Sequence, residues 1–183
     1  MLNLKVINLF AGPGTGKSIT AAGLFNLMKL DGHRVELVTE FAKDLTYAGR
    51  LSELGNQFYV TATQDQRQRQ LEGHVEWLIT DSPLPIALAY MPEEYHPWLP
   101  DAVWAAFDRY VNYNVLLHRR DDRPFEEYGR HQNEAQARML DNVIDSVFSE
   151  AAEDDDGLDD FSLEVLMDID TPANIYRWIK EIA

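Results

Sequence analysis

Apolar residues in this chain gather in short runs that are separated by longer amphipathic or polar segments. The runs that we interpret as strands cover residues 4–10, 34–39, 75–80, 114–117 and 162–167. The first is apolar nearly throughout, which is typical of a central strand buried on both faces of a parallel sheet. Strands that alternate with helices predict an α/β fold with a doubly wound parallel sheet and right-handed crossovers.

The segments between these runs are expected to be helical. Their predicted ranges are 18–30, 41–50, 56–71, 84–91, 101–110, 133–152 and 173–182. In the first of them Leu24, Phe25 and Met28 form an apolar stripe. Residues 92–100 are rich in Pro, Tyr and Trp and read as an irregular loop, which would either stack a base or form a satellite core. The acidic stretch 153–160 is expected to be a solvated loop.

A glycine-rich motif stands between the first strand and the first helix. Its residues are Ala11, Gly12, Pro13, Gly14, Thr15, Gly16, Lys17 and Ser18. Glycines let successive backbone N–H groups converge on a phosphate oxygen, and the helix that follows adds the positive end of its dipole. Lys17 is expected to reach the β- and γ-phosphates and Ser18 to ligate Mg²⁺. Ala11 replaces the usual first glycine. The motif therefore predicts a P-loop that binds ATP and Mg²⁺ through residues 12–18.

Composition narrows the class of protein. The chain has 183 residues, 45% of them hydrophobic, and reads as one domain over 1–183. It has no cysteine, which excludes disulfides and thiolate metal sites, and no apolar run of membrane-spanning length. The formal net charge of −15 argues against non-specific coating of nucleic acid, although a local basic region is compatible with it. No signal-peptide pattern opens the sequence, so we expect a cytoplasmic protein.

Two carboxylates end neighbouring apolar runs. Ligands of open α/β sheets bind outside the carboxyl ends of the strands, so Glu40 and Asp81 are candidates for proton transfer or metal binding. Asp81 would serve as the Walker B ligand of Mg²⁺, and Ser82 beside it as an acceptor contact. The alternatives are purely structural: Glu40 as a charge at a helix N-terminus, and Asp81 or Ser82 as an N-cap before Pro83.

Polar side chains on two further segments extend the predicted site. Gln64 and Arg67 share a face of the helix 56–71, where they would hold a base edge and an anion, or form an ordinary solvated face. A segment of about 119–131 combines a proline and a glycine with four arginines, and reads as a mobile lid or as a salt-bridged surface loop. Its arginines are Arg119, Arg120, Arg123 and Arg130. We expect Arg119 and Arg130 to act on the transferring phosphoryl group, and Arg120 and Arg123 to bind the nucleotide.

The succession of motifs resembles the nucleotide-kinase branch of P-loop proteins, which includes thymidylate and deoxynucleoside kinases. The resemblance implies a five-stranded sheet of order 2-3-1-4-5, a carboxylate after strand two, a base-holding helix before strand three and an arginine lid after strand four. Glu40, Gln64 with Arg67, and the segment 119–130 correspond to these features. Where many relatives have Asp-Arg this chain has Asp81-Ser82, so the contact to an acceptor phosphate differs.

The runs 7–18, 38–44 and 79–83 resemble, more closely, small bacteriophage-encoded P-loop proteins, some of which are 5-hydroxymethyluracil DNA kinases. This likeness implies a phosphotransferase that uses ATP to phosphorylate a pyrimidine nucleotide, with 5-hydroxymethyldeoxyuridine in DNA as the leading acceptor and the host cytoplasm as its location. A free deoxynucleoside or deoxynucleotide kinase, and a P-loop ATPase that acts on a protein partner, remain alternatives. The sequence leaves the oligomeric state open and allows a dimer.

Overall fold

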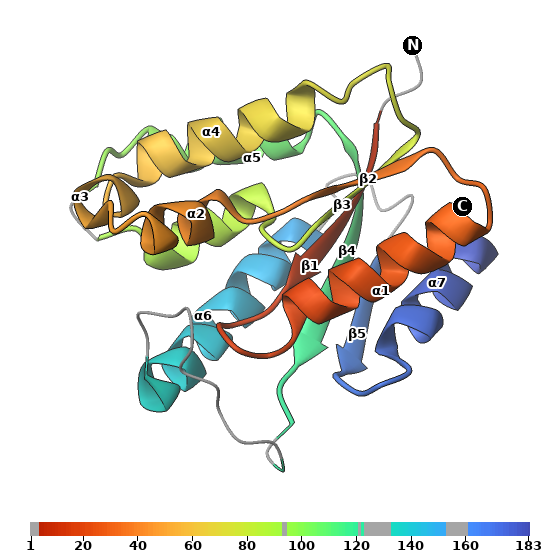
Figure 1. Cartoon of the computed structure of the whole chain (residues 1–183). Helices are drawn as coiled ribbons and strands as arrows, with labels where there is room; N and C mark the ends of the chain where they lie inside the picture. Colours follow the sequence, from red (N-terminus) through yellow and green to blue (C-terminus); the bar gives the residue numbers. More distant parts are fainter. Residues whose placement is uncertain (1–3, 93–94, 121, 123–132, 153–160) are drawn as a thin grey trace.

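A five-stranded parallel sheet forms the centre of the molecule (Figure 1). The computed structural model describes residues 4–92, 95–120, 122, 133–152 and 161–183. The strands are β1 (Lys5–Phe10), β2 (Val35–Val38), β3 (Trp77–Thr80), β4 (Val111–His118) and β5 (Ser162–Leu166). Their order is β2-β3-β1-β4-β5, and every neighbouring pair is parallel. The predicted strand order is confirmed, and the loops that follow β1, β2 and β3 leave the sheet at one edge.

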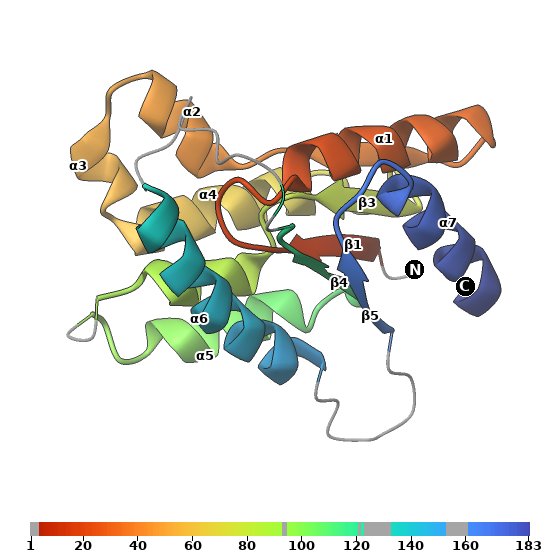
Figure 2. The same ribbon diagram turned by 90° about the horizontal axis from the view of Figure 1, so that it is seen from below.

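Helices cover both faces of this sheet (Figure 2). They are α1 (Lys17–Leu30), α2 (Phe41–Tyr47), α3 (Leu51–Leu54), α4 (Gln57–Arg69), the 3₁₀ helix η1 (Leu84–Tyr90), α5 (Leu99–Phe107), α6 (Glu134–Ala152) and α7 (Thr171–Ile182). Helices α1 and α7 pack side by side on one face, and η1, α5 and α6 pack on the other. Helices α2 and α3 extend beyond the carboxyl edge of the sheet (Figure 1).

Alternation of side chains along the central strand builds a core on each face. Ile7 and Leu9 of β1 join the cluster under α1 and α7, whereas Val6 and Phe10 point to the opposite face. All four are fully buried. A strand buried on both faces reads as a continuous apolar run, as the sequence predicted for this segment.

Local structure corrects two predicted helix ends and the type of a third helix. The helix expected over 41–50 stops at Tyr47, because Gly49 takes a positive φ of 67° that ends the helical path. The helix expected over 101–110 ends at Phe107, and β4 begins at Val111, which pairs with Lys5. The segment 84–91 forms a 3₁₀ helix rather than a regular α-helix.

Helix α4 departs from the solvated helix that its polar composition suggested. Thr61, Gln64 and Gln68 are buried and lie on one face, so the inward face of α4 is polar.

No helix in the described part of the chain combines the length and the apolar character that a membrane span needs.

Candidate functional site

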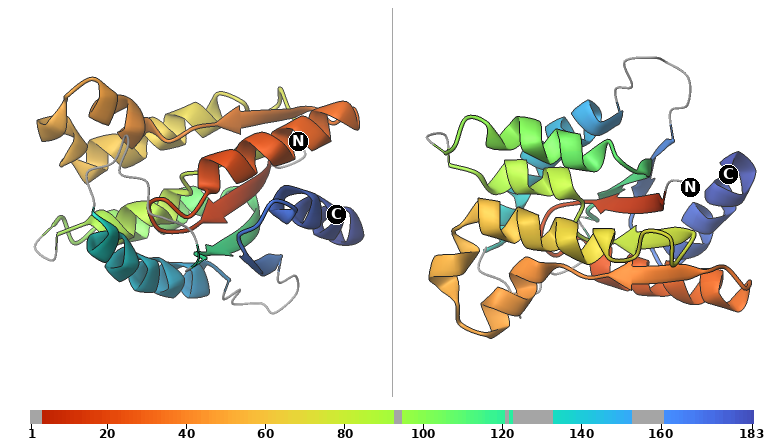
Figure 3. Two further views of the ribbon diagram at one scale, coloured as in Figure 1. Left: turned by 60° about the horizontal axis from the view of Figure 1, so that its bottom comes forward. Right: turned by 90° about the horizontal axis from the view of Figure 1, so that it is seen from above.

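The loop between β1 and α1 has the geometry that phosphate binding requires. Gly14 and Gly16 have positive φ angles of 83° and 121°, which place their backbone where residues with a side chain are strained. The Thr15 hydroxyl is buried without a hydrogen-bond partner in the described structure. The Lys17 ammonium donates to the carbonyl oxygens of Ala11 (2.7 Å) and Gly12 (3.2 Å), so its charge lies inside the turn of the loop. Figure 3 shows this loop curling from β1 into α1 beside the first turns of α6.

Asp81 connects three segments at the carboxyl edge of the sheet. Its Oδ2 accepts a hydrogen bond from the Ser18 hydroxyl at 2.6 Å, and its Oδ1 accepts from the Glu40 backbone N–H at 3.0 Å. It does not cap η1, whose N-cap is Pro83. The two side chains predicted to ligate Mg²⁺ are therefore in direct contact, and both oxygens of Asp81 accept hydrogen bonds.

Glu40 stands at the start of α2 but makes no capping hydrogen bond with its side chain. Burial raises the pKa of its carboxyl above the ordinary value, with Asp81 adding to the rise and Lys17 opposing it. Burial likewise lowers the pKa of Lys17, against the raising effect of Glu40 and Asp81. The charges of these three residues thus act on one another across the site, and the choice between proton transfer and a charge at the helix N-terminus stays open for Glu40.

Gln64 and Arg67 form hydrogen bonds with the backbone on either side of Glu40. The buried Gln64 amide accepts from the Phe41 N–H at 3.0 Å and donates to the Thr39 carbonyl at 3.4 Å. Arg67 also donates to Thr39, pairs with Asp44 at 2.5 Å, and lies over the Phe41 ring. Both side chains thus connect α4 to the β2–α2 junction. Their predicted contacts with a base edge and an anion stay predictions.

This arrangement leads to a stability prediction for Gln64. Replacing Gln64 with Ala leaves the buried N–H of Phe41 without its acceptor, which costs about 1–3 kcal/mol. We expect Gln64→Ala to lower the free energy of unfolding by that amount, measured by urea denaturation. Gln66→Ala, at an exposed position of the same helix, is the matched control and should stay within about 0.5 kcal/mol of wild type. An unchanged unfolding free energy together with a raised KM for the acceptor would instead assign Gln64 to substrate.

Of the four predicted lid arginines, the structure describes two. Arg119 follows β4 and donates to both oxygens of Asp141 on α6, at 2.9 and 3.0 Å, and to the Pro13 carbonyl at 2.7 Å. Arg120 instead pairs with Asp122. Arg123 and Arg130 lie outside the described residues, and so does most of the predicted lid. The structure therefore brings Arg119 to the P-loop and leaves the roles of the other three as predictions.

Asp141 and Tyr90 are not among the residues that the sequence pattern predicted. Asp141 sits within an amphipathic helix rich in acids, where nothing in the pattern distinguishes it. Tyr90, at the end of η1, has its pKa raised by burial and by the charges of Glu40 and Asp141. The approach of α6 and η1 to the P-loop is decided by packing between segments far apart in sequence.

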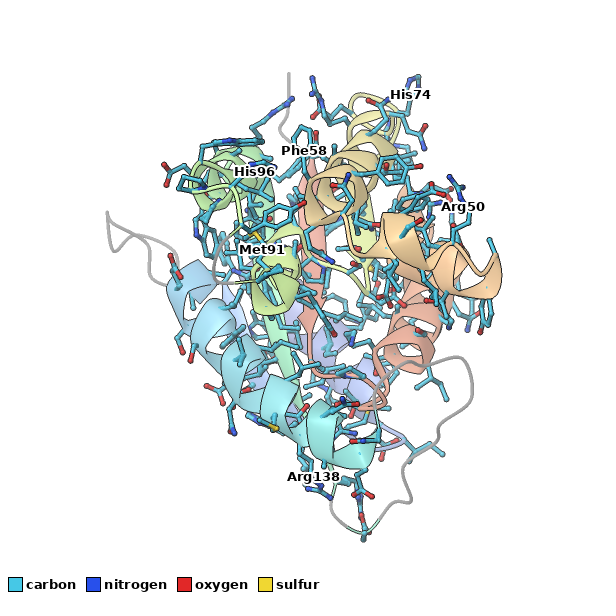
Figure 4. The ribbon with its side chains drawn as sticks, turned by 90° about the vertical axis from the view of Figure 1, so that its left-hand side faces the viewer. Arg50, Phe58, His74, Met91, His96 and Arg138 are labelled. Atoms are coloured by element: carbon cyan, nitrogen blue, oxygen red, sulfur yellow. The ribbon has the colours of Figure 1, made fainter. Side chains whose placement is uncertain are left out.

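The aromatic residues predicted beside the site lie mainly against α4. The Tyr95 hydroxyl accepts from the Phe58 backbone N–H at 3.2 Å. Trp98 is 48% exposed and stacks on His96, with Phe58 edge-on to it. Figure 4 shows Phe58 and His96 near each other and Arg138 at the opposite end of this view. Ser82 donates its backbone N–H to the Thr80 hydroxyl, and its side chain remains a predicted acceptor contact.

The residues present fit a nucleoside triphosphate with magnesium. The orphaned Thr15 hydroxyl, the Lys17 ammonium and the backbone of 12–18 would hold the phosphates. Ser18 and Asp81 offer the oxygen ligands that Mg²⁺ prefers. Around them, Arg119 pairs with Asp141, and Lys17 is subject to the charges of Glu40, Asp81 and Asp141.

Comparisons with known proteins agree with this geometry. No curated protein matches the chain. Among solved structures, thymidylate kinase from Ehrlichia chaffeensis superposes with a TM-score of 0.61, at 13% identity over 98% of both chains. This similarity shows the same P-loop fold. A family model described as an AAA domain matches residues 6–152, which is most of the 183 residues, and the chain therefore belongs to the AAA domain family.

Proposed function

We propose that this protein is an ATP-dependent phosphotransferase of the nucleotide-kinase type. The observation that carries the proposal is the meeting of Glu40, Asp81 and Lys17 at one edge of the sheet, with the Glu40 N–H on Asp81 and the Ser18 hydroxyl on the same carboxylate. One carboxylate serves the metal, and a second is left to serve an acceptor. The fold shared with a thymidylate kinase supports the same class of reaction.

Each of these residues has its own role in the phosphate transfer. An acceptor hydroxyl oxygen forms a bond to the γ-phosphorus while the bond from that phosphorus to the β–γ bridging oxygen breaks, and ADP leaves. Glu40 accepts the proton of the hydroxyl, because its carboxyl has a raised pKa and makes no capping bond. Asp81 and Ser18 would hold Mg²⁺. Lys17 and Arg119 neutralise charge on the phosphoryl oxygens.

For the acceptor, we propose a hydroxyl of a pyrimidine nucleotide, and specifically the 5-hydroxymethyl group of 5-hydroxymethyldeoxyuridine in phage DNA. The sequence resemblance to phage kinases and the clustering of arginines support it. The exposed ring of Trp98, close to Phe58, offers a surface on which a base can stack. A base in a duplex would have to leave the stack to reach the γ-phosphate. In this setting the protein works in the host cytoplasm.

The acceptor is tested by phosphate incorporation from labelled ATP. We expect labelling of DNA that contains 5-hydroxymethyluracil, and none of DNA that contains thymine in its place. Because a protein of charge −15 must bind DNA through local arginines, added salt should inhibit steeply, with a log–log slope of roughly 0.7–0.9 per phosphate contact. Efficient labelling of the free nucleoside or its monophosphate, with none on DNA, would assign a free deoxynucleotide kinase.

The second candidate is a P-loop ATPase that acts on a protein partner, and the AAA domain family match favours it. In that case Glu40 would orient a water molecule instead of an acceptor hydroxyl. Steady release of inorganic phosphate that no nucleoside, nucleotide or DNA acceptor alters would support this candidate over the kinase.

A further inference from the structure

Asp141 faces the phosphate loop from α6, a helix that none of the sequence motifs includes. A β-carbon built on Gly12 would lie 1.8 Å from Asp141 Oδ1 and 3.2 Å from the carbonyl oxygen of Ala137. A side chain at position 12 would therefore collide with the Asp141 carboxylate, and the Ala137 carbonyl of α6 lies close beside it. The carboxylate of Asp141 is held against the backbone that would bind the triphosphate.

A lone carboxylate in this place would oppose the function of the loop, since it repels phosphate. Arg119 compensates it: Nε donates to Oδ2 at 2.9 Å and Nη2 donates to Oδ1 at 3.0 Å. The side chains of Arg119 and Asp141 are only 12% and 27% exposed. A two-bond pair fixes the plane of the guanidinium as well as its position.

The same guanidinium also touches the P-loop. Its Nη2 donates to the Pro13 carbonyl at 2.7 Å, next to Ala11 and Gly12, whose carbonyls hold the Lys17 ammonium. The lysine of a P-loop reaches the β- and γ-phosphates. Arg119 therefore stands at the end of the loop where the terminal phosphates would lie.

Arg120 and Arg138 make ion pairs of a different kind. Arg120 pairs with Asp122 two residues away, and Arg138 pairs with Glu134 one turn away on α6. Both pairs are exposed and local in sequence, and Figure 4 shows Arg138 directed outward from α6. By contrast, the pair of Arg119 with Asp141 joins two elements 22 positions apart at the P-loop.

We propose that Asp141 is a positioning residue that holds the Arg119 guanidinium on the P-loop, so that the arginine meets the γ-phosphate of ATP already oriented. A fixed guanidinium loses less conformational freedom on binding than a mobile one. The inference rests on the proposed function in its choice of ATP as the ligand.

The positioning of Arg119 by Asp141 is tested by calorimetry. The protein is titrated with a non-hydrolysable ATP analogue and with ADP, both with Mg²⁺. The quantity to follow is the ratio of the two affinities, because a contact to the γ-phosphate strengthens only the triphosphate. We expect Arg119→Ala to reduce this ratio by about tenfold, the scale of a charge-assisted hydrogen bond. Asp141→Asn should reduce it several-fold, and the double variant no further than Arg119→Ala alone. Glu134→Gln, the matched acid on the same helix, should leave the ratio unchanged.

The outcomes separate positioning from simple electrostatics. Removing a negative charge beside the phosphates would by itself raise the affinity for the triphosphate, so an unchanged or raised ratio in Asp141→Asn overturns the proposal. Arg119→Lys keeps the charge but cannot form the two-bond pair. It should reduce the ratio of the two affinities almost as much as Arg119→Ala does. A ratio equal to that of wild type in Arg119→Lys also overturns the proposal, and this test holds even if Asp141→Asn does not fold. Absence of phosphate transfer by wild type would refute the kinase function while leaving the ratio measurable.

Discussion

Replacing Lys17 with Ala is expected to abolish phosphate transfer while the protein stays folded. The Lys17 ammonium lies inside the turn of the P-loop, where it donates to the carbonyl oxygens of Ala11 and Gly12 and feels the charges of Glu40 and Asp81. Loss of one preorganised donor at the phosphoryl group costs about 10²–10³ in rate, and the loss of a full charge lies at or above the upper end of that scale. The measurement is the initial rate of labelled phosphate transfer from ATP.

Fold integrity is checked beside that rate. Lys17 belongs to none of the apolar clusters, so the variant should keep the circular dichroism spectrum and a melting temperature close to that of wild type. The control is Lys29→Ala on the same helix, whose ammonium pairs with Glu36 at the surface. It should retain full activity. Near-normal transfer by Lys17→Ala would refute the assignment of the P-loop as the ATP site.

The second large effect is expected at the two carboxylates. Asp81→Asn and Glu40→Gln should each slow transfer by at least ~10²-fold, the scale of a lost metal-positioning group or general base. Their signatures should differ. In Asp81→Asn a single amide oxygen would remain to accept from two donors, the Ser18 hydroxyl and the Glu40 N–H, so this variant should need more Mg²⁺. Glu40→Gln should leave the Mg²⁺ requirement unchanged.

The raised pKa of Glu40 gives this prediction a pH dependence. A general base works when deprotonated, so the wild-type rate should rise with pH through the pKa of Glu40, above the ordinary value of 4.5, and this limb should vanish in Glu40→Gln. The contribution of Glu40 to the free energy of unfolding changes with pH in the opposite direction: it falls as pH rises. A carboxyl with a raised folded-state pKa destabilises the fold once pH exceeds its unfolded value, so Glu40→Gln should gain stability relative to wild type above about pH 4.5.

Glu36→Gln provides the matched control for Glu40→Gln, because Glu36 is a partly exposed acid on β2, the strand that precedes Glu40, and its carboxylate pairs with Lys29 at the surface. It should change neither the rate nor its pH profile. If Glu40→Gln retains a rate within a few-fold of wild type, Glu40 is only a charge at the start of α2. The same result for Asp81→Asn would remove the magnesium assignment.

Local patterns in the sequence determined the architecture and the phosphate-binding element. The apolar runs before Ala11, Glu40 and Asp81 predicted strands whose carboxyl ends meet, and the resemblance to nucleotide kinases supplied their order. These inferences succeed because a buried parallel strand needs a continuous apolar run, and because a P-loop is encoded by a few consecutive residues. Both signals are local in sequence.

Only the tertiary structure showed which distant groups the polar side chains contact. Gln64 lies in a polar helix that looks solvated, yet the helix packs on the β2–α2 junction and its amide bonds to the Phe41 backbone. Asp141 reaches Gly12 and Arg119 through the packing of α6, across separations that no local pattern reports. Sequence periodicity shows which residues share a face of an element. The partner that this face meets depends on how distant elements pack together.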